Sequence, residues 1–197
     1  MYITPRDGWI EVICGSMFAG KTEELIRRIK RIDYAKRKVL VFRPKIDNRY
    51  SETEVVSHSN YRYEAIVIEK AREIMKHVNP NTYAVAIDEA QFFDDELIKV
   101  CEHLADNGVR VICAGLDKDF RGEVFGLMGE LIVKAEYVSK VSAICTMCGN
   151  PATRTQRLIN GKPANFNDPI VMVGAAESYE PRCRHCHDVV GKPRYEK

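Results

Sequence analysis

Eight consecutive residues near the start of the chain have the types and spacing of a phosphate-binding loop. They match the pattern GxxxxGK[ST] and are Gly15, Ser16, Met17, Phe18, Ala19, Gly20, Lys21 and Thr22. Glycines let backbone N–H groups point at phosphate oxygens, the lysine reaches the β- and γ-phosphates, and the threonine hydroxyl binds Mg²⁺. The alternative is an ordinary glycine turn, but the flanking segments predict a strand before the loop and a helix after it, as a phosphate loop requires. We therefore expect this segment to bind ATP and Mg²⁺.

Two adjacent carboxylates, Asp88 and Glu89, follow an apolar run over 83–87. If that run is a parallel strand, both carboxylates lie at its carboxyl end, next to the phosphate loop. Asp88 then suits a role in holding Mg²⁺ through a bound water, and Glu89 is available to accept a proton. The alternative is the first turn of a helix, where acidic residues are also favoured. If Glu89 activates water, the protein is an ATPase, and if it activates a substrate hydroxyl, the protein is a kinase. The phosphate-binding residues are the same in both cases and do not distinguish them.

The seven cysteines of the chain fall into two groups. Three stand alone in apolar segments and are expected to be buried free thiols; they are Cys14, Cys101 and Cys113. The other four form two CxxC pairs, Cys145 with Cys148 and Cys183 with Cys186. Four thiolates in two turns predict a tetrahedral structural zinc site, which leaves no open position for catalysis. His185 or His187 is an alternative to Cys186 as the fourth ligand, although the all-cysteine set keeps the same spacing in both pairs.

The two cysteine pairs are far apart in the sequence. The 34 residues between Cys148 and Cys183 exceed the roughly 15–20 of a zinc ribbon. We therefore expect a substrate loop between the pairs, whose closure costs less entropy when one metal ties both ends.

The elements that must position these residues alternate between strand and helix. The patterns predict strands over 9–14, 39–42, 65–68, 83–87 and 109–114, and helices over 22–38, 69–77 and 94–107, while the polar segment 45–54 predicts a mobile loop. Continuous apolar strands of this kind are typical of an α/β fold of the P-loop NTPase type, with a mostly parallel sheet and helices on both faces. Beyond about residue 141 the sequence contains no long helical pattern and predicts mostly loops. We expect a nucleotide-binding domain over 1–140 and a small zinc-binding and substrate-loop domain over 141–197.

Composition favours small-molecule substrates. The 197 residues carry 30 basic and 28 acidic side chains, a formal charge of +2, which provides no strong field to attract nucleic acid or a membrane surface. No apolar run approaches the roughly 20 residues of a membrane span, and the first residues lack the apolar stretch of a signal peptide. We therefore expect a cytoplasmic protein without nucleic-acid or membrane partners.

Several motifs, in order along nearly the whole chain, resemble the type II, zinc-containing thymidine kinases. They are GSMFAGKT, DNRYS, IDEAQFF, GLDKDFRGEVF and two CxxC pairs that flank VMVGAAESYEPRCR. The resemblance implies transfer of the ATP γ-phosphate to the 5′-hydroxyl of thymidine, with Glu89 as the general base. It also implies a homotetramer inhibited by thymidine triphosphate. The chain departs from the pattern at Ala90, where some members have glycine, and in the CRHCHD context of the final cysteine pair.

The resemblance also assigns residues to the two substrates. For ATP and Mg²⁺ it implies the phosphate loop together with Asp47, Asn48, Arg49, Asp88, Glu89, Ala90 and Gln91. For thymidine it implies side chains of Met17, Phe92, Leu116, Phe120, Phe125 and Tyr179, and the backbone of a lasso strand comprising Ile170, Val171, Met172, Val173 and Gly174. Taken individually, the aromatic residues are more typical of a core than of a ligand site. An extended main chain can nevertheless match the acceptor, donor, acceptor edge of thymine.

Two rival functions are compatible with parts of the sequence. The residues Asp88, Glu89 and Ala90 are similar to the D-E-A motif of nucleic-acid-dependent ATPases, and cysteine ribbons often bind nucleic acid. Near-neutral charge and a single short α/β domain oppose that function. The second rival is a kinase for another nucleoside or nucleotide. His58 and His103 have no partner pattern and are interpreted as ordinary histidines.

Overall fold

The computed structural model describes residues 7–45, 54–56, 62–171 and 177–193. At its centre lies a six-stranded sheet in the order β5-β2-β6-β7-β1-β8, in which every neighbouring pair is parallel. The strands are β1 (Trp9–Gly15), β2 (Lys38–Pro44), β5 (Ile66–Ile68), β6 (Thr82–Ile87), β7 (Arg110–Leu116) and β8 (Tyr137–Lys140). The prediction of a mostly parallel α/β sheet is therefore confirmed, and each predicted strand is present within two residues of its expected ends.

Side chains of the central strands alternate between two apolar layers, as the period of a strand requires. On β6, Val85 and Ile87 belong to one buried cluster, whereas Ala84 and Ala86 belong to the other. The alanine face packs against α1 (Lys21–Tyr34), which buries Leu25, Ile26, Ile29 and Ile32. The small residues on the strands leave room for the large ones on the helix.

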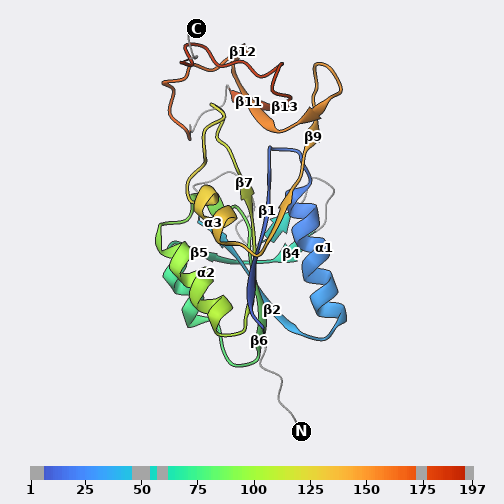
Figure 1. Cartoon of the computed structure of the whole chain (residues 1–197), viewed down its shortest axis with the longest axis vertical. Helices are drawn as coiled ribbons and strands as arrows, with labels where there is room; N and C mark the ends of the chain where they lie inside the picture. The colour runs from blue at the N-terminus through green and yellow to red at the C-terminus, as the bar shows by residue number, and fades with distance from the viewer. Residues whose placement is uncertain (1–6, 46–53, 57–61, 172–176, 194–197) are drawn as a thin grey trace.

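The opposite face of the sheet is covered by α2 (Glu96–Asp106), α3 (Met128–Lys134) and the 3₁₀-helix η1 (Ala71–Lys76). Figure 1 shows α1 on one side of the sheet and α2 with α3 on the other. Helices on both faces are thus confirmed. The helical stretch predicted over 69–77 is present as a 3₁₀-helix over Ala71–Lys76. Neither α3 nor β8 was predicted.

A buried ion cluster joins four elements of this core. Glu11 on β1 accepts hydrogen bonds from Arg28 of α1 at 2.6 Å and from Arg110 of β7 at 2.5 Å. Arg28 also donates to the Ser139 hydroxyl on β8 at 2.8 Å. Burial opposes the ionisation of Glu11, but hydrogen bonds from Arg110, Trp9 and Arg28 hold its pKa below the ordinary 4.5. The cluster therefore fastens a helix and an edge strand to the centre of the sheet.

Residues beyond the large sheet form two small antiparallel sheets at one end of the molecule (Figure 1). Their strands are β9 (Ala143–Ile144), β10 (Pro151–Ala152), β11 (Arg154–Ile159), β12 (Lys162–Pro163) and β13 (Glu177–Arg182). A further pair, β3 (Glu54–Val56) and β4 (Arg62–Glu64), is also antiparallel. Of the predicted mobile loop, 46–53 lie outside the described residues, and Glu54 begins β3. Among the helices that the structure describes, none combines the length and the hydropathy needed to cross a bilayer.

Candidate active site

The phosphate-binding motif forms the connection between β1 and α1, as its sequence context predicted. Gly20 has φ 81°, a left-handed conformation that glycine adopts without steric cost, and it caps the N-terminus of α1. A Cβ at Gly15 would lie 2.2 Å from the Val141 carbonyl oxygen, so a side chain has no room there. The local chain path therefore requires both motif glycines and aims helix N–H groups at the site.

Lys21 supplies the positive charge of the loop. Its Nζ donates a hydrogen bond to the Ser16 carbonyl at 2.8 Å. Burial lowers the pKa of Lys21, and the nearby carboxylates of Glu89 and Asp88 oppose that shift. Arrival of a phosphate would add further negative charge beside the ammonium and favour its charged form.

Asp88 is buried at the carboxyl end of β6. Its own backbone N–H donates to the Phe42 carbonyl at 2.9 Å, and its Oδ1 accepts from the Glu89 N–H at 3.0 Å. Burial, together with the neighbouring charge of Glu89, raises the pKa of Asp88 to about 7. A divalent cation at this position would reverse that shift, because opposite charge favours the ionised carboxylate.

Glu89 is held in an unusual backbone conformation with φ 52° and ψ 42°. Its Oε2 accepts a hydrogen bond from Gln91 Nε2 at 2.5 Å, and Gln91 Oε1 accepts from the Leu116 N–H at 3.1 Å. Gln91 is 4% exposed and lies in the short 3₁₀-helix η2 (Ala90–Phe92). The glutamine thus connects the carboxylate of Glu89 to the end of β7 and fixes its direction.

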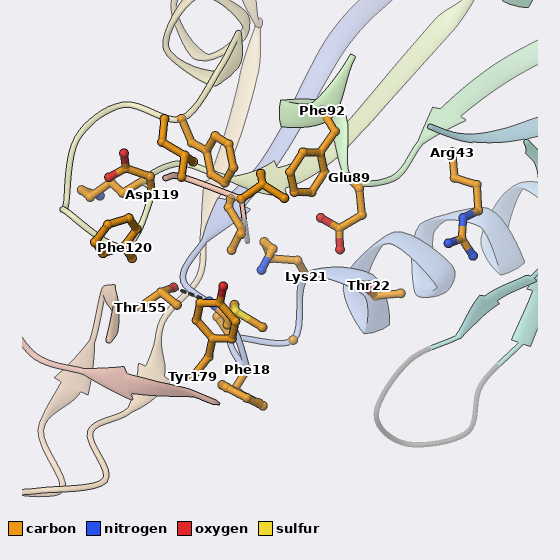
Figure 2. Close-up of a pocket in the computed structure, with 18 of the residues that line it drawn as sticks. Phe18, Lys21, Thr22, Arg43, Glu89, Phe92, Asp119, Phe120, Thr155 and Tyr179 are labelled. Atoms are coloured by element: carbon orange, nitrogen blue, oxygen red, sulfur yellow. Dashed lines mark hydrogen bonds between the residues drawn. The ribbon is translucent and has the colours of Figure 1, made fainter. Parts of the chain in front are cut away.

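A cavity of about 430 Å³ opens above these groups, and Figure 2 shows Lys21 and Glu89 facing it. The predicted site residues that line it are Met17, Phe18, Ala19, Gly20, Lys21, Thr22, Glu89, Phe92, Leu116, Phe120, Phe125, Ile170, Val171 and Tyr179. Gly15, Ser16, Asp88, Ala90 and Gln91 do not line it. The predicted residues Asp47, Asn48, Arg49, Met172, Val173 and Gly174 lie outside the described part of the chain.

Five lining residues were not predicted: Glu23, Arg43, Lys118, Asp119 and Thr155. Each belongs to a segment that was recognised for another reason, and none carries a spacing signal of its own. Position immediately after an expected motif or strand was the available clue for Glu23 and Arg43. Thr155 lies in the segment between the two cysteine pairs, where no spacing singled it out, and it reaches the site from β11.

Aromatic side chains from both parts of the fold surround one region of the cavity. Phe92 and Phe125 meet edge to face, with ring centroids 5.3 Å apart. Phe120 is only 4% exposed, because it also packs against Ala164 and Val189 in a small cluster of the C-terminal part. Phe120 therefore contributes both to a core and to a pocket wall, so the two interpretations considered for these aromatics are not exclusive. Tyr179 approaches from β13 (Figure 2).

The C-terminal part contacts the phosphate loop directly. The Met17 N–H donates to the Thr155 hydroxyl at 3.1 Å, and the Ser16 hydroxyl donates to the Ala152 carbonyl at 3.1 Å. Figure 2 shows the first of these bonds between β11 and the loop. The conformation of the loop therefore depends on residues that follow it by more than a hundred positions.

The four cysteines of the CxxC pairs converge. The sulfur atoms of Cys145, Cys148, Cys183 and Cys186 lie within 4.8 Å of one another. The Cys148 and Cys183 sulfurs are 3.6 Å apart, close to the roughly 3.8 Å expected for a tetrahedral site with Zn–S distances near 2.3 Å. Burial opposes ionisation of Cys145, but backbone N–H groups of Cys183, Met147 and Cys148 lower its pKa to about 6. The donor set and the hydrogen bonds to sulfur fit a thiolate metal site.

Two neighbours define the surroundings of this cysteine cluster. His187 Nε2 lies 2.8 Å from the Phe120 carbonyl oxygen and is thus engaged away from the sulfurs. Of the described residues, neither His187 nor His185 belongs to the group that can hold a metal. Ala19 of the phosphate loop packs against an apolar cluster that consists of Ala143, Ala152, Cys145 and Cys183. Two of the cysteines and the phosphate loop therefore share one small apolar core.

Comparison with known proteins adds a family to this geometry. The chain matches the thymidine kinase family over residues 8–187. Among solved structures, the ATPase DotB of Legionella pneumophila matches at 18% identity and a TM-score of 0.38, covering 66% of this chain and 35% of its own. The chain thus corresponds to only about a third of the length of DotB. The family match, by contrast, spans the phosphate loop, the paired carboxylates and all four cysteines. The chain belongs to the thymidine kinase family, and its cysteine cluster fits the zinc-containing type II members.

Proposed function

We propose that the protein is a thymidine kinase that transfers the γ-phosphate of ATP to the 5′-hydroxyl of thymidine. One observation carries the proposal: in a member of this family, a single cavity joins the phosphate loop to an aromatic-walled region, and Glu89 faces the cavity between them (Figure 2). An acceptor hydroxyl bound among the aromatic rings would lie beside the carboxylate and in reach of a phosphate on the loop.

The reaction then uses residues of this chain in distinct roles. Glu89 accepts the proton of the 5′-hydroxyl as its oxygen attacks phosphorus, and Lys21 with the loop N–H groups stabilises the negative charge of the transferred group. Thr22 and Asp88 would hold Mg²⁺, which neutralises phosphate charge when bound. Gly15, Ser16, Met17, Phe18, Ala19, Gly20, Ala90 and Gln91 complete the proposed ATP site, to which the family pattern adds Asp47, Asn48 and Arg49.

The aromatic region is proposed as the nucleoside pocket. Stacking and apolar contact from Phe92, Phe120, Phe125 and Tyr179 suit a flat, uncharged base, and Met17 with Leu116 complete its walls. Ile170 and Val171 line the same cavity. Backbone groups from Ile170 to Gly174 are proposed to read the thymine edge, since cytosine presents a different donor and acceptor pattern there.

Zinc is proposed as a structural component. Cys145, Cys148, Cys183 and Cys186 would hold it and tie the ends of the segment that separates the two pairs. The boundary between nucleotide-binding and zinc-binding domains near residue 141 belongs to the same proposal. A homotetramer, inhibition by thymidine triphosphate and a cytoplasmic location are proposed from the family pattern.

The proposal is tested by supplying labelled Mg-ATP with thymidine, deoxycytidine, deoxyadenosine or water in parallel, with zinc assayed on the same preparation. Thymidine monophosphate is expected as the dominant labelled product. Dominant phosphorylation of another nucleoside would reassign the acceptor. Release of free phosphate alone, stimulated by added DNA or RNA, would replace the kinase with a nucleic-acid-dependent ATPase.

A further inference from the structure

Arg157 on β11 is the largest side chain that the described structure withdraws completely from solvent, with 0% exposure. Burying a guanidinium is costly unless other groups pair with its charge and its N–H donors. The groups that contact the guanidinium therefore indicate which interactions compensate for its burial. Within the described part of the chain, the interactions of its guanidinium lead toward the walls of the aromatic pocket.

Among the described residues, three groups contact the guanidinium. Nη1 donates a hydrogen bond to the Pro169 carbonyl at 2.6 Å, and Nη2 lies 3.0 Å from Oε2 of Glu177, whose side chain is 4% exposed. The charged carbon lies over the Phe120 ring, 5.0 Å from its centroid. The same Glu177 oxygen accepts a hydrogen bond from the Tyr179 hydroxyl at 3.2 Å. One cation thus connects the backbone, a carboxylate and an aromatic ring.

The register of the small sheet explains how these side chains meet. Arg157 lies directly opposite Tyr179 in the antiparallel pair of β11 and β13, and Glu177 lies diagonally opposite. Residues at these positions project from the same face of a sheet. The strand pairing therefore places the arginine, the carboxylate and the tyrosine together.

Each contact fixes a different part of the cavity wall. Pro169 directly precedes Ile170 and Val171, whereas Glu177 binds Tyr179, and Phe120 belongs to the loop after β7. We propose that Arg157 is a positioning residue for the nucleoside, holding these three walls in register so that the pocket is preformed. The inference rests on the function proposed above and names the residue that holds the walls of that pocket in place.

If Arg157 only stabilised the fold, substitutions would change stability without a selective effect on thymidine binding. Buried ion pairs often add little stability compared with apolar groups of similar volume. Lysine retains the charge but has no planar fork to reach Pro169 and Glu177 together. If Arg157 positions the pocket walls, Arg157→Lys impairs thymidine binding even when the protein stays folded. Glu177→Gln tests the partner with almost no change of size.

Steady-state kinetics provide the test. We expect Arg157→Lys and Glu177→Gln to raise KM for thymidine by roughly 10- to 100-fold, because displaced walls lose preorganised contacts. KM for ATP should stay within about twofold, since the phosphate loop is not among the contacts of the guanidinium. Glu180→Gln is the matched control: it changes another carboxylate on β13 that pairs with an arginine, Arg182, outside the cavity. Its thymidine KM should equal that of the wild type.

Equal rises in both KM values, or no rise in either, would overturn the assignment. Hydrogen exchange on the ligand-free protein supplies a readout independent of activity. Amides of Ile170, Val171, Ser178 and Tyr179 should exchange at least about tenfold faster in both variants than in the wild type, with β1 unchanged. Unchanged exchange would also refute the positioning role. Failure of the wild type to phosphorylate thymidine would instead refute the proposed function, and exchange alone would then decide whether Arg157 orders these walls.

Discussion

Glu89 occupies a left-handed backbone conformation that costs a non-glycine residue about 1–3 kcal/mol. Such strain persists only where surrounding contacts determine the geometry, and here Gln91 holds the carboxylate from the side. The conformation turns the side chain toward the cavity, whereas the preceding Asp88 stays buried beneath it. Two adjacent carboxylates thereby obtain different environments, which suits one for a metal and the other for a proton.

Replacement of the proposed base should separate chemistry from binding. We expect Glu89→Gln to lower kcat roughly 10²- to 10⁴-fold, because the 5′-hydroxyl loses its proton acceptor. Affinity for a non-hydrolysable ATP analogue, measured by calorimetry, should remain close to the wild type. Glu130→Gln, which changes an exposed carboxylate on α3, is the control. Unchanged turnover in Glu89→Gln would remove the assignment.

Substitution of Gln91 tests whether its hydrogen bonds position the Glu89 carboxylate. In Gln91→Met the side chain keeps its length but loses its link between Glu89 and the Leu116 N–H. We expect kcat to fall about tenfold with little change in KM for ATP, because the carboxylate is present but less well aligned. A variant with wild-type kcat would show that the backbone alone positions Glu89.

At the scale of elements, the strands and helices predicted correctly were those whose apolar residues repeat at many positions. Buried strands such as 83–87 and the long amphipathic helix after the phosphate loop each carry several apolar residues in register. The helical stretch predicted over 69–77 forms a 3₁₀-helix over 71–76, and six residues are too few for periodicity to distinguish that type from an α-helix. The seven-residue α3 was missed for the same reason.

The ion cluster around Glu11 predicts a pH-dependent contribution to stability. Glu11→Gln should lower the free energy of unfolding by about 3 kcal/mol, because Arg28 and Arg110 lose a buried partner. This corresponds to a fall in Tm of roughly 6–12 °C at neutral pH. Since the folded state lowers the pKa of Glu11, its contribution is present above about pH 4.5 and is lost as the pH falls through the lowered value.

Thermal unfolding of both proteins between pH 3 and pH 7 measures this effect. The difference in Tm should be largest near neutrality and should shrink on acidification. Glu102→Gln removes an exposed carboxylate paired with Lys134 at 2.6 Å and should change stability by less than about 1 kcal/mol. A difference that is constant with pH would mean that packing, rather than charge, accounts for the loss.

At the scale of the whole molecule, the cysteine cluster and the phosphate loop are neighbours. Ala19 packs against an apolar cluster that contains Cys145 and Cys183 together with two alanines, and Met17 is hydrogen-bonded to Thr155. We expect Cys148→Ser to reduce zinc content and Tm, and to raise KM for thymidine more than KM for ATP, because metal binding contributes to the folding of this part. Met147→Ser, at an exposed position of the same turn, is the control. A zinc-free variant with wild-type stability and activity would refute a structural metal.

Motifs with fixed spacing revealed the phosphate loop, the carboxylate pair and the cysteines, because each places several residues within a short stretch. The remaining lining residues are single polar side chains brought in by tertiary structure. Thr155 reaches the pocket, and Arg157 reaches the residues that form its walls, only because β11 folds back over the loop, and no local pattern records that path. The sequence therefore predicts chemistry held in one segment better than chemistry assembled from several.

The way in which Phe120 is held has a consequence for protein synthesis. Its loop follows β7, yet its carbonyl oxygen contacts His187, and the neighbouring Arg121 carbonyl accepts a hydrogen bond from Lys192. Chains emerge from the ribosome at about 5–20 residues per second with N-terminal parts folding first. The nascent chain can therefore assemble its parallel sheet several seconds before these anchors appear. Completion of the aromatic pocket waits for these anchors, and a chain stalled before they emerge would carry a phosphate loop without a finished proposed nucleoside site.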